Sequence, residues 1–250
     1  MSEASRFLNK ANKNLFLLLE KKEAQLWEAR LERVQQLPGV SSTFKRIADA
    51  PDREQLCPYL AEIRYALAFV GLGFQVQVEP LGKKGPDLGI SRDGHSAVIE
   101  VKSFRQLDPD PLNISLSSRE FLDGTFLLEP CGNLERDIKK IISRSVEKFK
   151  QVGNGDSIIA FWNDDEKDIE SELAINELCN DAAQRRLALP PGLLFFLYGS
   201  NWQRPRQQFY CFPLRVLENP HINWIQEIES SFVDTLMQRA LTRGRKAVVN

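Results

Sequence analysis

Residues 85–102 read GPDLGISRDGHSAVIEVK, and this stretch predicts a β-hairpin. The pair Asp93-Gly94 lies between two extended runs and favours a two-residue type I′ turn, because both central positions of that turn need φ > 0. With this turn, the numbers of paired residues always sum to 187, so Asp87 lies directly opposite Glu100. The hairpin is therefore expected to bring two carboxylates together.

Glu100-Val101-Lys102 places two charges on one face of the second strand, because side chains alternate between faces, while Ile99 and Val101 point into the core. Directly opposed residues have Cβ atoms roughly 4.5–5.5 Å apart, so opposed carboxylates repel and favour a cation between them. Mg²⁺ binds through one or two carboxylates and keeps several waters. A lysine beside it can orient or deprotonate the attacking water and offset charge on a phosphate. These residues predict metal-assisted phosphate chemistry.

The combination of Pro86-Asp87 with Glu100-Val101-Lys102, with twelve residues between Asp87 and Glu100, resembles the signature of the PD-(D/E)xK nuclease superfamily, which includes many restriction enzymes. The resemblance covers about residues 58–162 and implies metal-dependent hydrolysis of DNA phosphodiester bonds. It implies that Asp87 and Glu100 bind Mg²⁺ or Mn²⁺, with the carbonyl of Val101 as a further ligand, and that Lys102 is the catalytic lysine. The periodicity alone indicates an α/β protein. The resemblance implies a restriction-endonuclease-like core, a mixed central sheet flanked by helices.

A third acid, Glu62, lies in a predicted helix over residues 58–72, where it borders the buried side. The apolar stripe of this helix consists of Ile63, Leu67 and Val70. A buried carboxylate needs a partner or a metal. In the superfamily the helix before the hairpin often contributes a glutamate, which implies that Glu62 is a further catalytic and metal-binding residue. The alternative, which stays open, is a salt bridge to Arg64 or another local cation.

The remaining sequence predicts how the chain is organised. We expect a helical region at residues 1–56, as an N-terminal extension, and a nuclease-like domain at 57–250 with an irregular insert at about 103–132. Predicted helices occupy much of 1–37, 42–50, 134–151 and 166–186, and predicted strands occupy 74–78, 157–162, 193–198 and 207–214.

The predicted helix at 134–151 carries Arg136, Lys140 and Arg144 at i+4 spacing on one side. Since the net charge of the chain is −1, a surface that binds DNA must be local. The resemblance implies that this helix lies beside the active site and contacts the DNA backbone. The alternative is a solvated helix face balanced by neighbouring acids.

Other classes of function find little support in the sequence. No apolar run approaches the ~20 residues of a membrane span, and no secretory pattern opens the chain, so a cytoplasmic protein without a membrane partner is expected. Four scattered cysteines without CxxC spacing argue against a zinc site and predict free, buried thiols. There is neither a P-loop nor a Gly-x-Gly-x-x-Gly run, so no nucleotide cofactor is expected. His95 and His221 are the only histidines, and His95 is expected to be structural or exposed at the hairpin turn.

Two functions from different classes stay open. The first is a metal-dependent DNA endonuclease of restriction, defence or repair type. The second is a non-catalytic domain of the same fold that acts as a binding or assembly module. The intact set of Asp87, Glu100 and Lys102 favours the enzyme. The N-terminal helices could pair two subunits into a homodimer for double-strand cleavage, and packing within one chain is the alternative.

Overall fold

The computed structural model describes residues 3–82, 85–104, 155–163, 189–200 and 210–213, together with the isolated positions 143, 147, 152, 178, 180, 181 and 224. Within these residues lie four helices and one six-stranded sheet. The chain thus has the predicted α/β character. The predicted helices at 134–151 and 166–186 lie almost entirely outside the described residues.

Three helices precede the segment that carries Glu62: α1 (Glu3–Leu18), α2 (Lys21–Val34) and α3 (Val40–Asp49). The sequence predicts that this region is helical, but it does not predict the break between α1 and α2. Helix α1 packs against α2 and α3 within the same chain. Gly39 precedes α3 with φ of +83°, and a Cβ atom there would lie 2.1 Å from the carbonyl oxygen of Val78. Only glycine fits this close approach, which brings the start of α3 against the edge of the sheet.

Helix α4 (Arg53–Gly71) carries Glu62 and begins five residues before the predicted start at Pro58. The reason is the cap: the side chain of Asp52 accepts a hydrogen bond of 2.7 Å from the backbone N–H of Gln55. The proposed boundary between residues 56 and 57 therefore falls inside this helix, and the division into two regions stays a prediction. Val70 is 37% exposed, so the predicted apolar stripe does not continue to it.

The sheet has the strand order β1-β2-β3-β4-β5-β6. Its strands are β1 (Gln75–Val78), β2 (Leu88–Arg92), β3 (His95–Phe104), β4 (Ser157–Asn163), β5 (Leu193–Ser200) and β6 (Tyr210–Pro213). The pairs β1–β2, β2–β3 and β5–β6 are antiparallel, and β3–β4 and β4–β5 are parallel. The predicted strands are present, although β3 continues through Ser103 and Phe104, which the sequence places in the insert at about 103–132. The rest of that insert lies outside the described residues.

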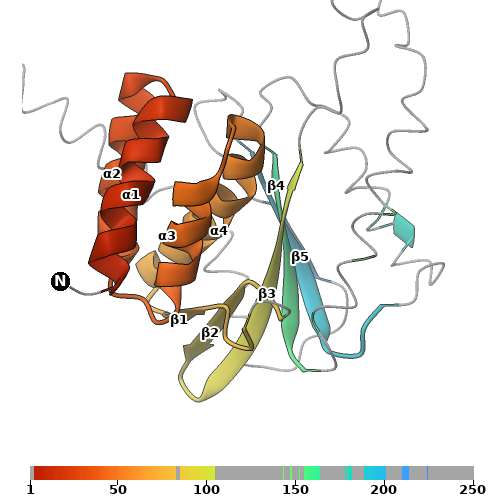
Figure 1. The fold of residues 1–250 in the computed structure, drawn as a ribbon. Coiled ribbons are helices and arrows are strands. Elements are labelled where there is room, and N and C mark those ends of the chain that lie inside the picture. Colours follow the sequence, from red (N-terminus) through yellow and green to blue (C-terminus); the bar gives the residue numbers. More distant parts are fainter. Residues whose placement is uncertain are drawn as a thin grey trace, which may run out of the picture.

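Helices α3 and α4 lie between the sheet and the outer pair α1 and α2 (Figure 1). One apolar core runs from α1 through α4 to the inner face of the sheet, and it includes Ile99 and Val101 of β3. Tyr65 of α4 donates a hydrogen bond of 2.6 Å to the backbone carbonyl of Phe161 in β4. This bond and the core hold α4, and with it Glu62, in a defined position on the sheet.

Other predictions are met in the described part of the chain. Cys57 is a buried thiol, and His95 is exposed at the hairpin turn. None of the helices described here is long and apolar enough to cross a membrane.

Candidate active site

The predicted hairpin is present with the predicted register. Arg92 pairs with His95 and Leu88 pairs with Ile99 across β2 and β3. The turn residues Asp93 and Gly94 have φ of +53° and +81°, as a type I′ turn requires. Asp87 precedes Leu88 and Glu100 follows Ile99, so the two acids lie at opposite positions just beyond the last pair of the hairpin.

The carboxylate of Asp87 is anchored at the end of β2. Its Oδ2 accepts a hydrogen bond of 2.8 Å from the backbone N–H of Val101, and its backbone carbonyl accepts one of 2.8 Å from Glu79. Continued pairing would direct the Val101 N–H to residue 86, but the chain leaves the ladder there and Asp87 takes its place. The N–H and C=O of one strand residue point toward the same neighbour. The carbonyl of Val101 therefore faces the same edge as the Asp87 carboxylate.

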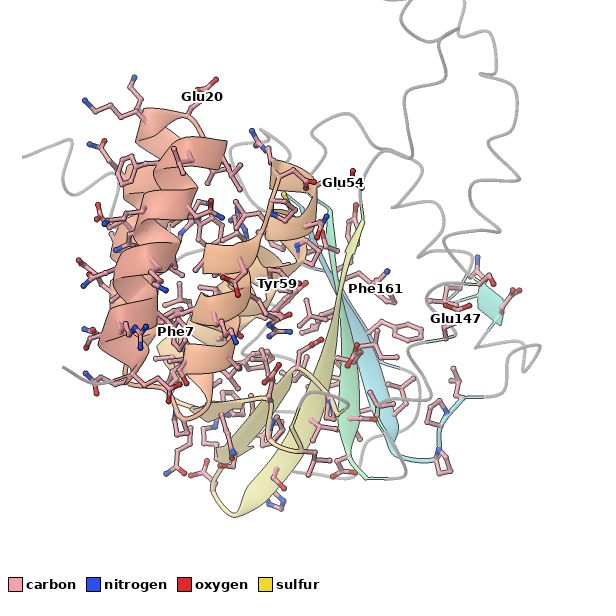
Figure 2. The ribbon with its side chains drawn as sticks, viewed as in Figure 1. Phe7, Glu20, Glu54, Tyr59, Glu147 and Phe161 are labelled. Carbon is pink, nitrogen blue, oxygen red and sulfur yellow. The ribbon has the colours of Figure 1, made fainter. Side chains whose placement is uncertain are left out.

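Glu100 and Lys102 project from the face of the sheet opposite α4. Lys102 is the neighbour of Phe161 in β4, and such neighbours share a face. Trp162, the next residue of β4, packs its ring edge-on against Tyr65 of α4, with 6.1 Å between the ring centroids. Phe161 therefore points away from the helices, as Figure 2 also shows. Glu100 is only 1% exposed, so its charge, if present, must be compensated inside the protein.

Glu62 is buried on α4, at 5% exposure, as expected. Its Oε2 lies 2.7 Å from Nη2 of Arg46, which comes from α3, 16 residues earlier in the chain. Arg64, suggested above as a partner, instead places its guanidinium over the rings of Trp27 and Trp162, at 4.6 and 4.5 Å from their centroids. Of the two alternatives for Glu62, the salt bridge is thus present, but with a cation that the local sequence does not identify.

Arg46 joins Glu62 to a fourth acid, Glu79, which the sequence does not single out. Nη2 of Arg46 lies 3.2 Å from Oε1 of Glu79 and donates a hydrogen bond of 2.9 Å to Oγ1 of Thr43. Glu79 has φ of +46°. This left-handed backbone conformation is strained for a residue other than glycine, and such strain often accompanies a functional site. The only local signal is that Glu79 follows strand β1 and precedes Pro80, which does not predict its conformation.

The electrostatics of Glu62 show that Asp87 lies nearby. Burial raises the pKa of the Glu62 carboxyl well above its usual range, the charge of Asp87 raises it further, and Arg46 acts in the opposite direction. The charge of Asp87 therefore acts at two places. Its carboxylate bonds to the backbone of β3 and also contributes negative potential at Glu62 on the α4 side.

The donors at the hairpin fit a hard divalent cation. Carboxylate oxygens of Asp87 and Glu100 and the carbonyl of Val101 are ligands of the type that Mg²⁺ prefers, and Mg²⁺ binds to one or two carboxylates with water completing its shell. Among the described residues, no three His, Cys, Asp or Glu side chains form a group that could hold a metal. The candidate ligands are therefore two carboxylates and one carbonyl, and water would supply the remaining ligands. Glu62 is not among them, because it is paired with Arg46.

Arg136, Lys140 and Arg144 lie outside the described residues, so their predicted contact with DNA stays a prediction. None of the family models, curated proteins or solved structures compared with this chain matches it. A function for this chain therefore has to be inferred from its own residues and geometry.

Proposed function

We propose that this chain is a metal-dependent nuclease that hydrolyses DNA phosphodiester bonds, an endonuclease on a restriction-endonuclease-like core. The observation that supports the proposal best is the hairpin register. It sets Asp87 opposite Glu100, places Lys102 on the face of Glu100, and turns the Val101 amide toward the Asp87 carboxylate. The antiparallel run β1–β2–β3 followed by parallel β4 is consistent with such a core.

In this proposal Asp87 and Glu100 hold the divalent cation, Mg²⁺ or Mn²⁺, with help from the Val101 carbonyl. When bound, the cation would polarise the phosphodiester and lower the pKa of a bound water. Lys102 would orient the attacking water and offset the charge that develops on the phosphate. Burial of Glu100 would keep its carboxylate rigid and its interactions strong.

A non-catalytic binding or assembly module is the second candidate. The observation in its favour is that Glu62, the acid expected as a third member of the site, is paired with Arg46 on the α4 side of the sheet, whereas Glu100 and Lys102 project from the other face. The two candidates differ in one property that is simple to measure, which is hydrolysis of nucleic acid that requires a metal.

The test is to incubate supercoiled DNA, linear DNA and RNA with the protein, in Mg²⁺ or Mn²⁺ and in a chelator. We expect DNA cleavage only with the metal. Asp87→Asn and Glu100→Gln should abolish cleavage and weaken divalent binding measured by calorimetry, with folding unchanged or improved because each removes a repelling charge. Asp93→Asn, at an exposed turn position of the same hairpin, is the matched control. Unchanged metal affinity in both active-site variants, or no cleavage of any substrate by the wild type, would rule the proposal out.

A further inference from the structure

Three side-chain oxygens surround one nitrogen of Arg46. Nη2 lies 2.7 Å from Oε2 of Glu62, 2.9 Å from Oγ1 of Thr43 and 3.2 Å from Oε1 of Glu79. Thr43 is fully buried and the side chains of Glu62 and Glu79 are 6% and 12% exposed. The arrangement is an oxygen cage with a guanidinium nitrogen at its centre.

We propose that Arg46 is a built-in cation that occupies this cage and so limits the chain to one divalent metal, held at Asp87 and Glu100. The limit of one rests on the proposed function, because that function supplies the first metal. That Arg46 occupies the cage does not depend on the proposed function, because the distances around Nη2 show it directly. Arg46 acts here as the counter-ion of two acids that lie beside Asp87, and it does not belong to the hairpin.

The cage has the chemistry of a cation site apart from Arg46. Carboxylate and hydroxyl oxygens are ligands for hard cations, which bind oxygen at about 2.0–2.6 Å. The three oxygens lie 2.7, 2.9 and 3.2 Å from Nη2, so they would have to move inward to bind such an ion. Asp87 increases the negative potential, as its effect on the pKa of Glu62 indicates. Two buried carboxyl groups in such a place either keep a proton or need a positive charge beside them, and Arg46 supplies that charge.

Each wall of the cage is held independently of Arg46. Thr43 and Glu62 lie on the helices α3 and α4, which pack together. The backbone N–H of Glu79 donates a hydrogen bond of 2.8 Å to the carbonyl of Asp87. The guanidinium of Arg46 also lies over the ring of Tyr59, 4.8 Å from its centroid, which keeps the cation in place. Removal of the guanidinium should thus leave the oxygens converging on an empty centre.

The experiment is a calorimetric titration of the full chain with Mn²⁺. We expect one Mn²⁺ per wild-type chain, two per Arg46→Met chain, and one when Arg46→Met is combined with Glu62→Gln. Arg46→Lys should keep one, because an ammonium can occupy the same cage. The control is Arg53→Met, which removes a comparable but exposed salt bridge, to Glu23 at 3.3 Å, and should not change the count.

A folded Arg46→Met chain that binds no more Mn²⁺ than the wild type would overturn the inference, and so would two Mn²⁺ in the wild type. If the wild type binds none and Arg46→Met binds one, the cage is supported and the proposed nuclease site fails. If Arg46→Met is poorly folded, Mn²⁺ should raise its thermal unfolding midpoint by more than it raises that of the wild type. An equal or smaller rise would again contradict the inference. A purely structural role for Arg46 would change stability without changing the number of metals.

Discussion

The hydrogen bond from Tyr65 to the backbone of Phe161 provides a sharp test of how α4 is held on the sheet. Tyr65 and Phe161 are fully buried, and the bond is 2.6 Å long. Tyr65→Phe removes one oxygen atom and leaves the ring, its edge-on contact with Trp162 and the helix unchanged. The variant therefore isolates the contribution of this bond.

A buried acceptor that loses its donor costs about 1–3 kcal/mol. We expect the free energy of unfolding of Tyr65→Phe to fall by that amount, measured by urea denaturation followed by circular dichroism. Tyr59→Phe on the same helix is the control. Tyr59 contacts Arg46 through its ring, so loss of its hydroxyl should change stability by less than about 0.5 kcal/mol.

The pH dependence gives a second readout of the same group. Burial raises the pKa of the Tyr65 hydroxyl well above its usual value. The folded state keeps this proton where the unfolded chain has lost it, so stability should fall as pH rises above the ordinary tyrosine pKa of about 10. Tyr65→Phe should lose that component of the pH slope. Equal stability of Tyr65→Phe and wild type at neutral pH, with the same slope above pH ~10, would refute the role of this bond.

Two further changes test the hairpin and the predicted DNA contact. Gly94→Ala should lower the free energy of unfolding by about 1–2 kcal/mol in urea titrations, because alanine is disfavoured at its φ of +81°; an unchanged or higher value would contradict the assigned turn. Neutralising Lys140 and Arg144 together should weaken binding to all DNA sequences alike. It should also reduce the slope of log K against log salt concentration by about one or two, since each phosphate contact contributes ~0.9 to that slope. Binding isotherms in Ca²⁺ at several salt concentrations measure this slope, and an unchanged slope would show that these residues do not contact the DNA backbone.

The hairpin could be predicted from sequence because its determinants are local. Asp93-Gly94 determines the turn, the turn determines the register, and the register places Asp87 opposite Glu100. The burial of Glu62 also followed from helical periodicity. The predicted start of α4 at residue 58 is five residues too late, because the Asp52 cap determines the actual start at Arg53.

The surroundings of Glu62 could not be predicted because they depend on tertiary packing. Arg46 reaches it from another helix, and a charge pattern along α4 points only to near neighbours such as Arg64. Arg64 is instead held between two tryptophan rings that come from α2 and β4. Glu79 joins the group through a left-handed backbone conformation that its sequence does not favour.

The most direct test of the central claim is the single-turnover rate of DNA cleavage by wild type and Lys102→Ala at saturating Mg²⁺. The proposed mechanism predicts metal-dependent cleavage by the wild type and a rate reduced by roughly 10²–10³-fold in Lys102→Ala, the scale of losing one preorganised electrostatic group. DNA binding measured in Ca²⁺ should be retained, as should calorimetric metal binding. A near-normal rate in Lys102→Ala would remove this lysine from the mechanism, and a wild type that cleaves nothing in Mg²⁺ or Mn²⁺ would contradict the claim of a nuclease.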